Sequence, residues 1–345
     1  MKISIVIPTY NHANQLSEVI DCLFKSQIDE IESIEVIVVD DGSDNPAKSV
    51  VESKKAASPF SLRYVFQENA GPAAARNRGF HEASNEIVLF IDDDILVFPD
   101  LIKNHLEAHQ IYNGAVICGQ SPYLIPEISS PAFRYLNMLF NDGLKSIGKE
   151  NFIKVDIVAS GNISVEKGLF ERGHIYCESL KIPAGEEFEL SFYLKEKGVP
   201  VYFAKELKGW HLQPSTIEDS CVQNYKYGLG IAELAVKKPQ VLRLRQPRRS
   251  YEANAQIRKE DSLSLKIKKS LRKKLVNTFV REKMLSTVKR LENVIPHDRF
   301  LFVLYRWVVG TYFAAGIVDG RKLFKKENSE CLHVASHCRS SFSRA

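Results

Sequence analysis

Three consecutive carboxylates, Asp92, Asp93 and Asp94, follow the apolar run "IVLFI". Adjacent like charges repel one another, so stability alone does not account for the cluster. A strand that ends in Asp-x-Asp can hold a hard divalent cation, and such a cation can bridge two phosphates. Carboxylate oxygens suit Mg²⁺ or Mn²⁺, and an additional histidine ligand favours Mn²⁺. The alternative interpretation is a solvated acidic turn, because short Asp-x-Asp patterns also arise by chance.

A second acidic loop, "DDGS" at residues 40–43, follows the β-branched run "IEVIVV". Asp-Gly is common in turns, and the two acids can cap the next helix. A carboxylate at this point can also accept a hydrogen bond from a nucleotide base or a ribose. Neither Gly-x-Gly-x-x-Gly nor a P-loop follows the first apolar run, which continues into "PTYN". A Rossmann-type dehydrogenase is therefore disfavoured, and phosphates bound at this site would need a cation.

The first 120 residues alternate strand and helix patterns. The runs "KISIVIP", "IEVIVVD", "LRYVFQ" and "EIVLFID" predict strands, and Asn14 is the expected N-cap of the first helix. Continuous apolar runs joined by helices predict an α/β fold with a mostly parallel sheet and helices on both faces. Right-handed crossovers place the carboxyl ends of the strands along one edge, where open α/β sheets bind ligands. Both acidic loops and "PTYN" follow strands that end at this edge.

Residues 120–215 contain more aromatic residues and fewer strand–helix repeats. "VDIVASGNISVEK" predicts a strand and a turn, and "GEEFELSFYLKEKG" predicts a helix that ends at a glycine. "PVYFAKELKGWHLQP" predicts strands around a turn. After residue 216 the chain is largely helical and basic.

The composition fits a globular protein. The chain has 345 residues and a net charge of +5, enough for one large domain with an appendage or for two domains. Its six cysteines form no C-x-x-C pair, which favours a reducing compartment. The sequence begins with a strand pattern rather than a signal peptide, so we expect a cytoplasmic protein. A weak metal-like pattern in the polar tail, which we do not expect to bind a metal, consists of Cys331, His333, His337 and Cys338.

Six motifs carry a resemblance to a known family. In chain order they are "SIVIPTYN", "VIVVDDGS", "NAGPAAARNRGF", "FIDDDI", "GNISVEK" and "GEEFELSFYLKEKG". This order resembles that of family 2 glycosyltransferases of GT-A fold, from Met1 to about Pro214. The resemblance implies a catalytic domain over residues 1–215, with a nucleotide-binding half (1–119) and an acceptor half (120–215). We expect a helical, basic region over 216–330 and a flexible tail over 331–345.

The resemblance implies a nucleotide site at the edge of the sheet. Its residues are Pro8, Thr9, Tyr10, Asn11, Asp41, Gly71, Arg76, Asp92 and Asp93. Asp41 is expected to accept a hydrogen bond from uracil N3–H, and Arg76 to neutralise the diphosphate; a surface arginine on a helix is the alternative for Arg76. Asp92 is expected on the ribose side, Asp93 near ribose or a sugar hydroxyl, and Asp94 on a bound Mn²⁺ or Mg²⁺.

The acceptor half is expected to supply a base. An acceptor hydroxyl that attacks an anomeric carbon must lose its proton, and a carboxylate can accept it. The family places this base in an acidic pair at a helix start, which corresponds to Glu186 and Glu187, with Glu187 aligned to the base. Glutamate replaces the usual aspartate, so either residue remains a candidate. The helix dipole favours glutamates in a first turn in any case.

Three more residues of the acceptor half are expected near the metal and the sugars. His211 corresponds to a family histidine that binds the metal, Trp210 is a candidate wall for a sugar ring, and Asn162 is expected to line the donor-sugar pocket. Packing in the protein interior is the alternative for His211 and Trp210.

The basic C-terminal region lies outside the resemblance. "KIKKSLRKK" has six bases in nine positions, typical of a solvated helix face or of a helix on an anionic surface, with an apolar stripe of Ile267, Leu271 and Leu275. The apolar run 300–318 approaches one bilayer thickness, but Arg306 and two glycines disfavour a spanning helix. We expect helices that pack on the catalytic domain or contact an anionic membrane surface at its inner face, and no nucleic-acid partner.

Together these features predict an inverting, metal-dependent glycosyltransferase. It would move a sugar from a nucleotide sugar, expected to be a UDP-sugar, to a hydroxyl of a glycan or lipid-linked acceptor in cell-surface polysaccharide biosynthesis. The alternative is a nucleotide-sugar-binding homologue without transfer activity, which would bind nucleotide and metal but turn over no acceptor.

Overall fold

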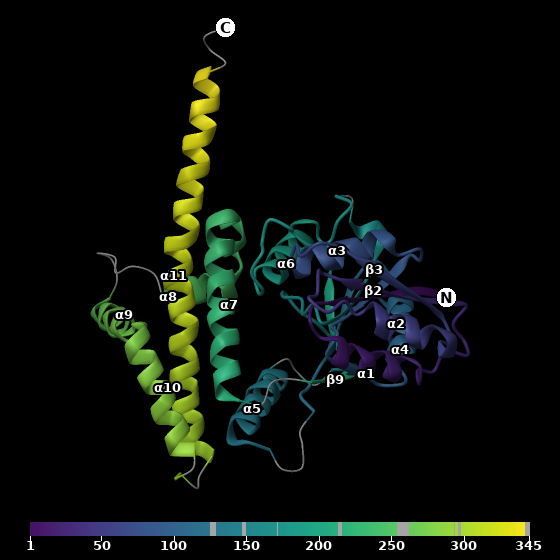
Figure 1. The fold of residues 1–345 in the computed structure, drawn as a ribbon, viewed down its shortest axis with the longest axis horizontal. Coiled ribbons are helices and arrows are strands. Elements are labelled where there is room, and N and C mark those ends of the chain that lie inside the picture. Colours follow the sequence, from purple (N-terminus) through teal and green to yellow (C-terminus); the bar gives the residue numbers. More distant parts are fainter. Residues whose placement is uncertain are drawn as a thin grey trace. The chain divides into compact units, whose positions relative to one another are not determined.

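Figure 1 shows the computed structural model, which describes residues 1–124, 129–146, 150–170, 172–212, 216–253, 262–292, 294–295 and 298–341. The chain divides into two compact units. The first consists of Met1–Ser129, Leu136–Lys181 and Glu186–Pro214. The second consists of Ser130–Tyr135, Ile182–Gly185 and Ser215–Ala345.

The first unit is built on a nine-stranded sheet. Its strands are β1 (Lys2–Thr9), β2 (Ser33–Asp40), β3 (Ser61–Phe66), β4 (Ile87–Ile91), β5 (Ile95–Val97), β6 (Val116–Gln120), β7 (Phe152–Lys154), β8 (Asn162–Glu166) and β9 (Val201–His211). Their order is β3-β2-β1-β4-β8-β6-β9-β5, and β7 pairs with β9. Strands β1 to β4 pair in parallel, as do β6 and β9, whereas β8, β5 and β7 add antiparallel pairs.

Helices cover both faces of this sheet. They are α1 (Ala13–Leu23), α2 (Lys48–Lys54), α3 (Pro72–Glu82), α4 (Leu101–Ile111) and α6 (Glu186–Glu196). The chain also forms the short helices η1 (Lys55–Ala57) and η2 (Lys167–Leu169), and α5 (Pro131–Ser146), which begins in the second unit. Alternate side chains of β1 enter two separate cores, because successive residues of a strand point to opposite faces. Ile5 packs with α1 and α4, whereas Val6 packs with α3 and α6. The predicted α/β fold with two covered faces is confirmed.

Two local predictions were wrong. The stretch predicted as strands around a turn is one continuous strand, β9, which bends at a register shift opposite Gly119 and Gln120 and so pairs with β6, β7 and β5 in turn. The N-cap of α1 is His12 rather than Asn14. Asn11 has a positive φ of 60°, so the chain has already turned into the helix before Asn14.

The second unit is helical. Its further elements are α7 (Ile217–Lys237), η3 (Pro239–Arg243), α8 (Arg245–Ala253), α9 (Leu263–Leu275), α10 (Thr278–Glu292) and α11 (Asp298–Ser341). Helices α7 and α10 lie along α11 (Figure 1). Backbones of α7 and α11 approach closely at two glycines: an added Cβ would lie 2.1 Å from Phe313 O at Gly228, and 2.1 Å from Tyr225 O at Gly316. Glycine at both positions is therefore required by this packing.

Helix α11 is the long apolar element of the second unit. Its segment Asp298–Phe324 is long and apolar enough to cross a membrane, but half of its most apolar window is buried within the protein. The helical backbone continues to Ser341, into the segment predicted as a flexible tail. The side chains of Leu271 and of the tail pattern at 331–338 lie outside the described residues.

Candidate active site

The carboxyl ends of β1, β2 and β4 lie side by side because these strands pair in parallel. Thr9 at the end of β1 is the register partner of Asp40 at the end of β2, and Asp41 N–H donates to Thr9 O at 2.9 Å. Strand β4, on the other side of β1, ends at Ile91 immediately before the triple aspartate. The loops singled out in the sequence therefore meet at one edge of the sheet.

Each aspartate of the triple has a different partner. Asp92 Oδ1 accepts a hydrogen bond from Arg76 Nη2 at 2.6 Å. Asp93 Oδ1 lies 3.2 Å from His12 Nδ1, and Asp94 Oδ2 lies 3.1 Å from His211 Nε2. One guanidinium and two imidazoles thus offset the mutual repulsion of the three carboxylates.

Arg76 is buried at the base of the site. Its side chain is 7% exposed and lies over the ring of Tyr176, with 5.5 Å between its Cζ and the ring centroid. Burial lowers the pKa of Arg76, but the charge of Asp92 and other neighbouring groups raises it further, so the guanidinium stays charged. Nε and Nη1 of Arg76 are buried without a hydrogen-bond partner among the described residues. A buried cation with spare donors suits an anionic ligand, and the interpretation of Arg76 as a surface residue does not hold.

Asp93 and His12 form a second pair. Burial raises the pKa of Asp93, and the hydrogen bond with His12 opposes part of that rise. The hydrogen bond to Asp93 raises the pKa of His12, against the effect of its own burial. His12 precedes α1 directly and has no counterpart among the residues predicted from sequence.

The sheet brings His211 to Asp94 although 117 residues separate them. Strand β5 begins one residue after Asp94 and pairs with β9 so that Ile95 faces His211. Leu212 N–H also donates to Asp94 O at 2.8 Å, and the Tyr123 ring stacks on His211. Burial lowers the pKa of His211, but the hydrogen bond to Asp94 and the charges of the three aspartates outweigh this effect and raise it.

The Asp94–His211 pair has the donor types of a metal site. A carboxylate oxygen and an imidazole nitrogen are both ligands that Mn²⁺ accepts, and the strand pairing fixes their approach. The residues present therefore fit the expected cation. Among the described residues, no group of three or more His, Cys, Asp or Glu side chains is arranged to hold a metal, so other ligands would come from bound phosphate or water.

Asp41 fixes the loop that precedes α3. Its Oδ1 accepts from Gln67 Nε2 at 2.7 Å and from Ala70 N at 2.9 Å, and its Oδ2 accepts from Gly71 N at 2.9 Å. A carboxylate can accept about four hydrogen bonds, so Asp41 retains acceptor capacity. Gly71 has a φ of +94°, which L-residues with a side chain rarely adopt.

The loop after β1 is fastened to the loop after β2. Asn11 N–H donates to Ser43 Oγ at 2.9 Å, and the Asn11 amide exchanges two hydrogen bonds with Asp44. Thr9 is buried, whereas Tyr10 is exposed. The expected base-binding loop of residues 8–11, which starts at Pro8, is thus held in place with the Tyr10 ring presented to solvent.

Glu187 and Glu186 occupy different environments at the start of α6. Glu187 Oε1 accepts from Ser160 N at 2.9 Å and from Ser160 Oγ at 2.5 Å. Glu186 is 5% exposed, and its Oε2 has no hydrogen-bond partner among the described residues. Burial and the neighbouring Glu187 raise the pKa of Glu186 to about 7, with Arg76 opposing the rise. Glu187 is therefore oriented by defined donors, and Glu186 is a buried acid.

The contacts of Asn162 and Trp210 differ from those expected. Asn162 is 2% exposed; its Nδ2 donates to Leu207 O at 3.0 Å and its Oδ1 lies 2.9 Å from His105 Nε2. Both ends of its amide are engaged inside the protein, so a sugar contact through this side chain has no support here. Trp210 is 37% exposed and packs on Phe98, and strand alternation points it to the face opposite His211.

Sequence reasoning missed Ser160, which orients Glu187, and Gly161, which lies against Asp92. Gly161 O accepts from Asp92 N at 3.0 Å, and a Cβ on Gly161 would lie 2.6 Å from Asp92 Oδ2. The quoted motif "GNISVEK" contains Gly161, and a glycine next to a strand is the signal that could have indicated a close backbone approach.

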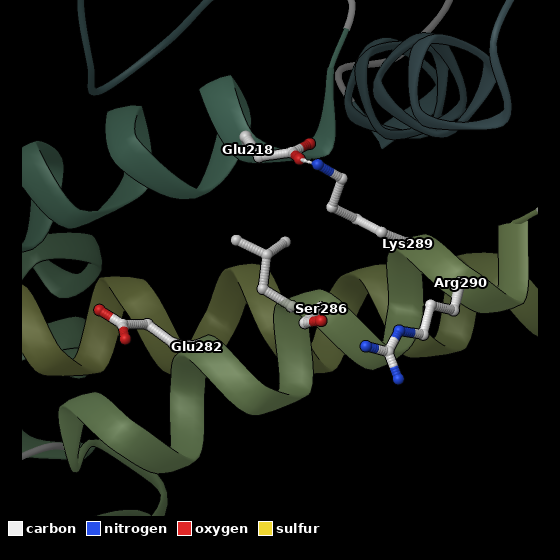
Figure 2. A pocket seen from close by; sticks show the side chains of 6 residues that line it. Glu218, Glu282, Ser286, Lys289 and Arg290 are labelled. Atoms are coloured by element: carbon white, nitrogen blue, oxygen red, sulfur yellow. Dashed lines mark ion pairs between the residues drawn. The ribbon is translucent and has the colours of Figure 1, made fainter.

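A cavity of about 480 Å³ opens in the second unit and contains none of the predicted site residues. Its lining consists of Glu218, Glu282, Leu285, Ser286, Lys289 and Arg290. Figure 2 shows Glu218 of α7 and Lys289 of α10 pointing toward each other in an ion pair across it. Because Glu218 and Lys289 pair with each other, we assign no chemistry to this cavity.

The chain was compared with known protein sequences. Residues 4–172 match the family described as Glycosyl transferase family 2. The chain is 36% identical over 119 residues to the uncharacterized glycosyltransferase YfnE of Bacillus subtilis, covering 34% of this chain and 30% of that protein. It is 29% identical over 232 residues to a validoxylamine A glucosyltransferase of Streptomyces hygroscopicus subsp. jinggangensis, covering 60% of this chain and 54% of that protein. The matches thus span about half or less of the length of these relatives.

A solved structure shares the fold. A mannosyltransferase from Pyrobaculum calidifontis, in complex with GDP-Man and Mn²⁺, matches with a TM-score of 0.59 and 15% identity, covering 91% of this chain and 86% of that one. At this identity the likeness concerns the fold alone, and it confirms the GT-A type predicted from the motifs.

Proposed function

Because the chain belongs to glycosyl transferase family 2, we propose that it transfers a sugar from a nucleotide sugar to an acceptor hydroxyl, with inversion at the anomeric carbon. The observation that carries the proposal is the placement of the Asp92–Asp94 loop beside the Ser160–Glu187 contact, with Gly161 touching Asp92. The edge proposed to bind the diphosphate and an oriented carboxylate therefore lie next to each other.

In the proposed reaction the acceptor oxygen bonds to the anomeric carbon as the bond from that carbon to the diphosphate oxygen breaks. Glu187 accepts the proton of the acceptor hydroxyl, and the nucleoside diphosphate leaves with the bonding electron pair. Two hydrogen bonds from Ser160 hold Glu187 Oε1, which leaves Oε2 as the atom to receive the proton. Glu187 is half-buried, and this exposure gives an acceptor access to it.

Asp94 and His211 would hold Mn²⁺ or Mg²⁺, which when bound stabilises the charge of the departing diphosphate. The Arg76 guanidinium supplies a second positive group, fixed by Asp92 at 2.6 Å, whose remaining donors are buried at the site. Asp92 thus orients Arg76, and in this proposal it also lies near the ribose.

We propose uracil as the nucleotide base. Uracil in a nucleotide offers a single N–H donor, and the buried Asp41 carboxylate retains capacity for one further hydrogen bond after its contacts with Gln67, Ala70 and Gly71. The mannosyltransferase that shares the fold was solved with GDP-Man, so a guanosine donor is the comparison to make.

We propose that the acceptor is a glycan or lipid-linked molecule, and that the second unit contacts an anionic membrane at its cytoplasmic face. On α11, Phe300, Val303 and Trp307 form an exposed apolar stripe at helical spacing, with exposed Arg299 and Arg306 beside it. Apolar and aromatic side chains flanked by bases are typical of helices that lie on anionic bilayers.

Turnover of a donor panel tests the proposed function. UDP-, GDP-, CDP- and TDP-sugars are incubated with Mn²⁺ and a mixture of glycan and polyprenyl-phosphate-sugar acceptors, and released nucleotide is measured. We expect release from a UDP-sugar, reduced in Glu187→Gln, and a product of inverted anomeric configuration by proton NMR. Release from no donor, with nucleotide binding intact, would instead support a binding protein without transfer activity.

A further inference from the structure

A buried polar network lies behind the site, between α4 and β8. His105 Nε2 is 2.9 Å from Asn162 Oδ1, and His105 Nδ1 is 2.8 Å from Ser164 Oγ. His109 Nε2 is 2.8 Å from the same Ser164 Oγ, and His109 Nδ1 is 3.3 Å from Glu166 Oε1. His105, Asn162 and Ser164 are at most 2% exposed.

The spacing of these residues matches their elements. His105 and His109 are four residues apart and share one face of α4. Asn162, Ser164 and Glu166 alternate along β8 and share one face of that strand. Ser164 Oγ lies within hydrogen-bond distance of both histidines. Glu166 also accepts a hydrogen bond from Gly114 N at 2.9 Å, which holds the turn after α4 in place.

The direction of the hydrogen bonds follows from Asn162. Its Nδ2 donates to Leu207 O, so its Oδ1 needs a donor, and His105 Nε2 must carry a proton. Burial lowers the pKa of His105 to about 3, so its ring is neutral and Nδ1 accepts from the Ser164 hydroxyl. Ser164 has no second proton, and His109 Nε2 must therefore donate to Ser164 Oγ.

The last contact of this hydrogen-bond network, between His109 and Glu166, then requires one more proton. If His109 is protonated at Nε2 alone and Glu166 is ionised, a nitrogen lone pair faces a carboxylate oxygen at 3.3 Å. A proton shared by His109 and Glu166 removes this repulsion. Glu166 and His105 are the titratable groups that act on His109 among the described residues. The pKa of His109 is lowered, because burial outweighs the opposing effect of Glu166.

This network ends at the segment that joins the two parts of the site. Asn162 follows Gly161, whose carbonyl accepts from Asp92 N, and Ser160, whose N–H and hydroxyl hold Glu187. Strand β8 also pairs with β4 so that Asn162 faces Ile91, the residue before the triple aspartate. Displacement of Asn162 would therefore move both Glu187 and Asp92.

We propose that His105, Ser164 and His109 are positioning residues for the glycosyl transfer proposed above, and that they act by holding Asn162 through a network that shares a proton between His109 and Glu166. None of the three touches the reacting atoms. They set the place of the Ser160–Asn162 segment and, through it, the distance between Glu187 and the metal-binding edge.

Two matched serine variants test the positioning role. Ser164 and Ser4 are both fully buried and hydrogen-bonded, and Ser4 lies near the start of β1, bonded to Glu35 Oε1 at 2.6 Å and away from the site. We expect Ser164→Ala to lower kcat by about 10- to 100-fold with the donor KM nearly unchanged, because small displacements of reacting groups carry such effects. Ser4→Ala is expected to lower the Tm by about as much as Ser164→Ala does, but without the loss in kcat. Equal effects of the two variants on kcat would overturn the proposal.

Two variants of His109 separate positioning from packing. Glutamine can place its Nε2–H where His109 Nε2 donates but cannot titrate, whereas alanine removes the donor. His109→Gln is expected to keep kcat within about threefold of the wild type, and His109→Ala to lose about tenfold or more. As pH rises and the shared proton leaves, the ratio of wild-type to His109→Gln kcat should fall. A constant ratio would overturn the shared proton, and equal losses in both variants would overturn the positioning role.

The protonation of His105 can be measured without activity, so failure of the proposed function would not obscure this result. Long-range proton–nitrogen NMR of ¹⁵N-histidine-labelled protein, assigned with His105→Gln and His109→Gln, reports which ring nitrogen carries hydrogen. We expect both His105 and His109 to be protonated at Nε2. A His105 ring protonated only at Nδ1 would place a lone pair against Asn162 Oδ1 and would contradict the network.

Discussion

The two regions of the chain carry charge of opposite sign and use it differently. Residues 1–214 contain 20 Lys and Arg and 30 Asp and Glu, whereas residues 215–345 contain 27 and 12. In the first region the acidic clusters face inward to partners such as Arg76 and His211. In the second, bases such as Arg299 and Arg306 are exposed. The acidic excess thus accompanies the proposed cation site, and the basic excess accompanies the proposed contact with an anionic surface.

Packing differs between the regions as well. In the first unit, strands rich in β-branched residues are buried between helices, and several buried polar side chains are hydrogen-bonded to one another. The second holds α7 and α11 together by close backbone approach at Gly228 and Gly316. Changes in the first unit are therefore expected to alter chemistry, and changes on the surface of the second to alter attachment.

Removal of the carboxylate proposed to bind the metal should have the largest effect. Asp94→Ala is expected to lower kcat by on the order of 10³-fold, because a bound cation contributes several kcal/mol of charge stabilisation and each 1.36 kcal/mol is tenfold in rate. The measurement is nucleotide release at saturating Mn²⁺. Asp21→Ala, at an exposed aspartate of α1, is the control and should retain full activity. Full activity in Asp94→Ala would contradict the proposal that Asp94 binds a catalytic metal ion.

Neutralising the expected base should have the next largest effect. Glu187→Gln is expected to lower kcat by about 10²–10³-fold, because a positioned general base contributes in this range. The donor KM should change little, since Ser160 can still donate to the amide oxygen. Steady-state kinetics at several donor concentrations separates the two constants. Glu196→Gln on the exposed face of the same helix is the control; similar losses in both variants would argue against a base at Glu187.

Membrane contact should depend on the second region and leave chemistry unchanged. Arg299→Ser with Arg306→Ser is expected to weaken binding to phosphatidylglycerol vesicles by roughly 30-fold, because each base near an anionic surface contributes about 1 kcal/mol. Vesicle co-sedimentation measures the loss, and kcat on a soluble acceptor should be retained. The matched double variant Arg248→Ser with Arg249→Ser removes two exposed bases of α8. An equal loss there would show that net charge, rather than the α11 surface, governs binding.

Fluorescence sharpens that comparison. The chain has two tryptophans, so Trp210→Phe leaves Trp307 of the α11 stripe as the sole indole. We expect its emission to shift to shorter wavelength when phosphatidylglycerol vesicles are added, because an indole that enters the bilayer interface leaves water. An unchanged spectrum with vesicles bound would place the contact elsewhere on the second unit.

The smallest expected effect concerns stability at Glu186. Its pKa is raised from 4.5 to about 7 in the folded protein, first by burial and then by Glu187, so the folded state favours the protonated form. Stability from this group is therefore fully present below about pH 4.5 and declines as pH rises toward 7. Glu186→Gln should raise the Tm at pH 8 by a few degrees and by much less at pH 5. A Tm difference that does not vary with pH would contradict the assignment, and Glu196→Gln is again the exposed control.

Much of the first unit could be predicted because its signals are local. The apolar runs that become β1, β2 and β4 are continuous, and the acidic loops follow them directly in the chain. The GT-A type and the match to the family followed from motif order. The course of β9 could not be predicted, because its bend depends on three pairing partners distant in sequence.

The site was predictable in part. Asp94 and His211 were assigned to one metal through the resemblance, and the structure brings them within 3.1 Å. The role of Asn162 was not predictable, because it depends on His105 of another helix. The spacing signals "HLEAH" and "NISVE" were present, but polar residues on a buried strand identify a network only once the facing helix is known.

The most direct test of the central claim is thermal unfolding of the wild type and of Asp94→Ala with UDP, each with and without Mn²⁺. A ligand that binds only the folded state stabilises it by about 2.7 kcal/mol at 100 times its Kd. We predict a clear rise in the wild-type Tm with UDP and Mn²⁺ together, a small rise with either alone, and no added rise from Mn²⁺ in Asp94→Ala. An equal rise with UDP in both proteins, with or without Mn²⁺, would contradict a metal-assisted nucleotide site at Asp94.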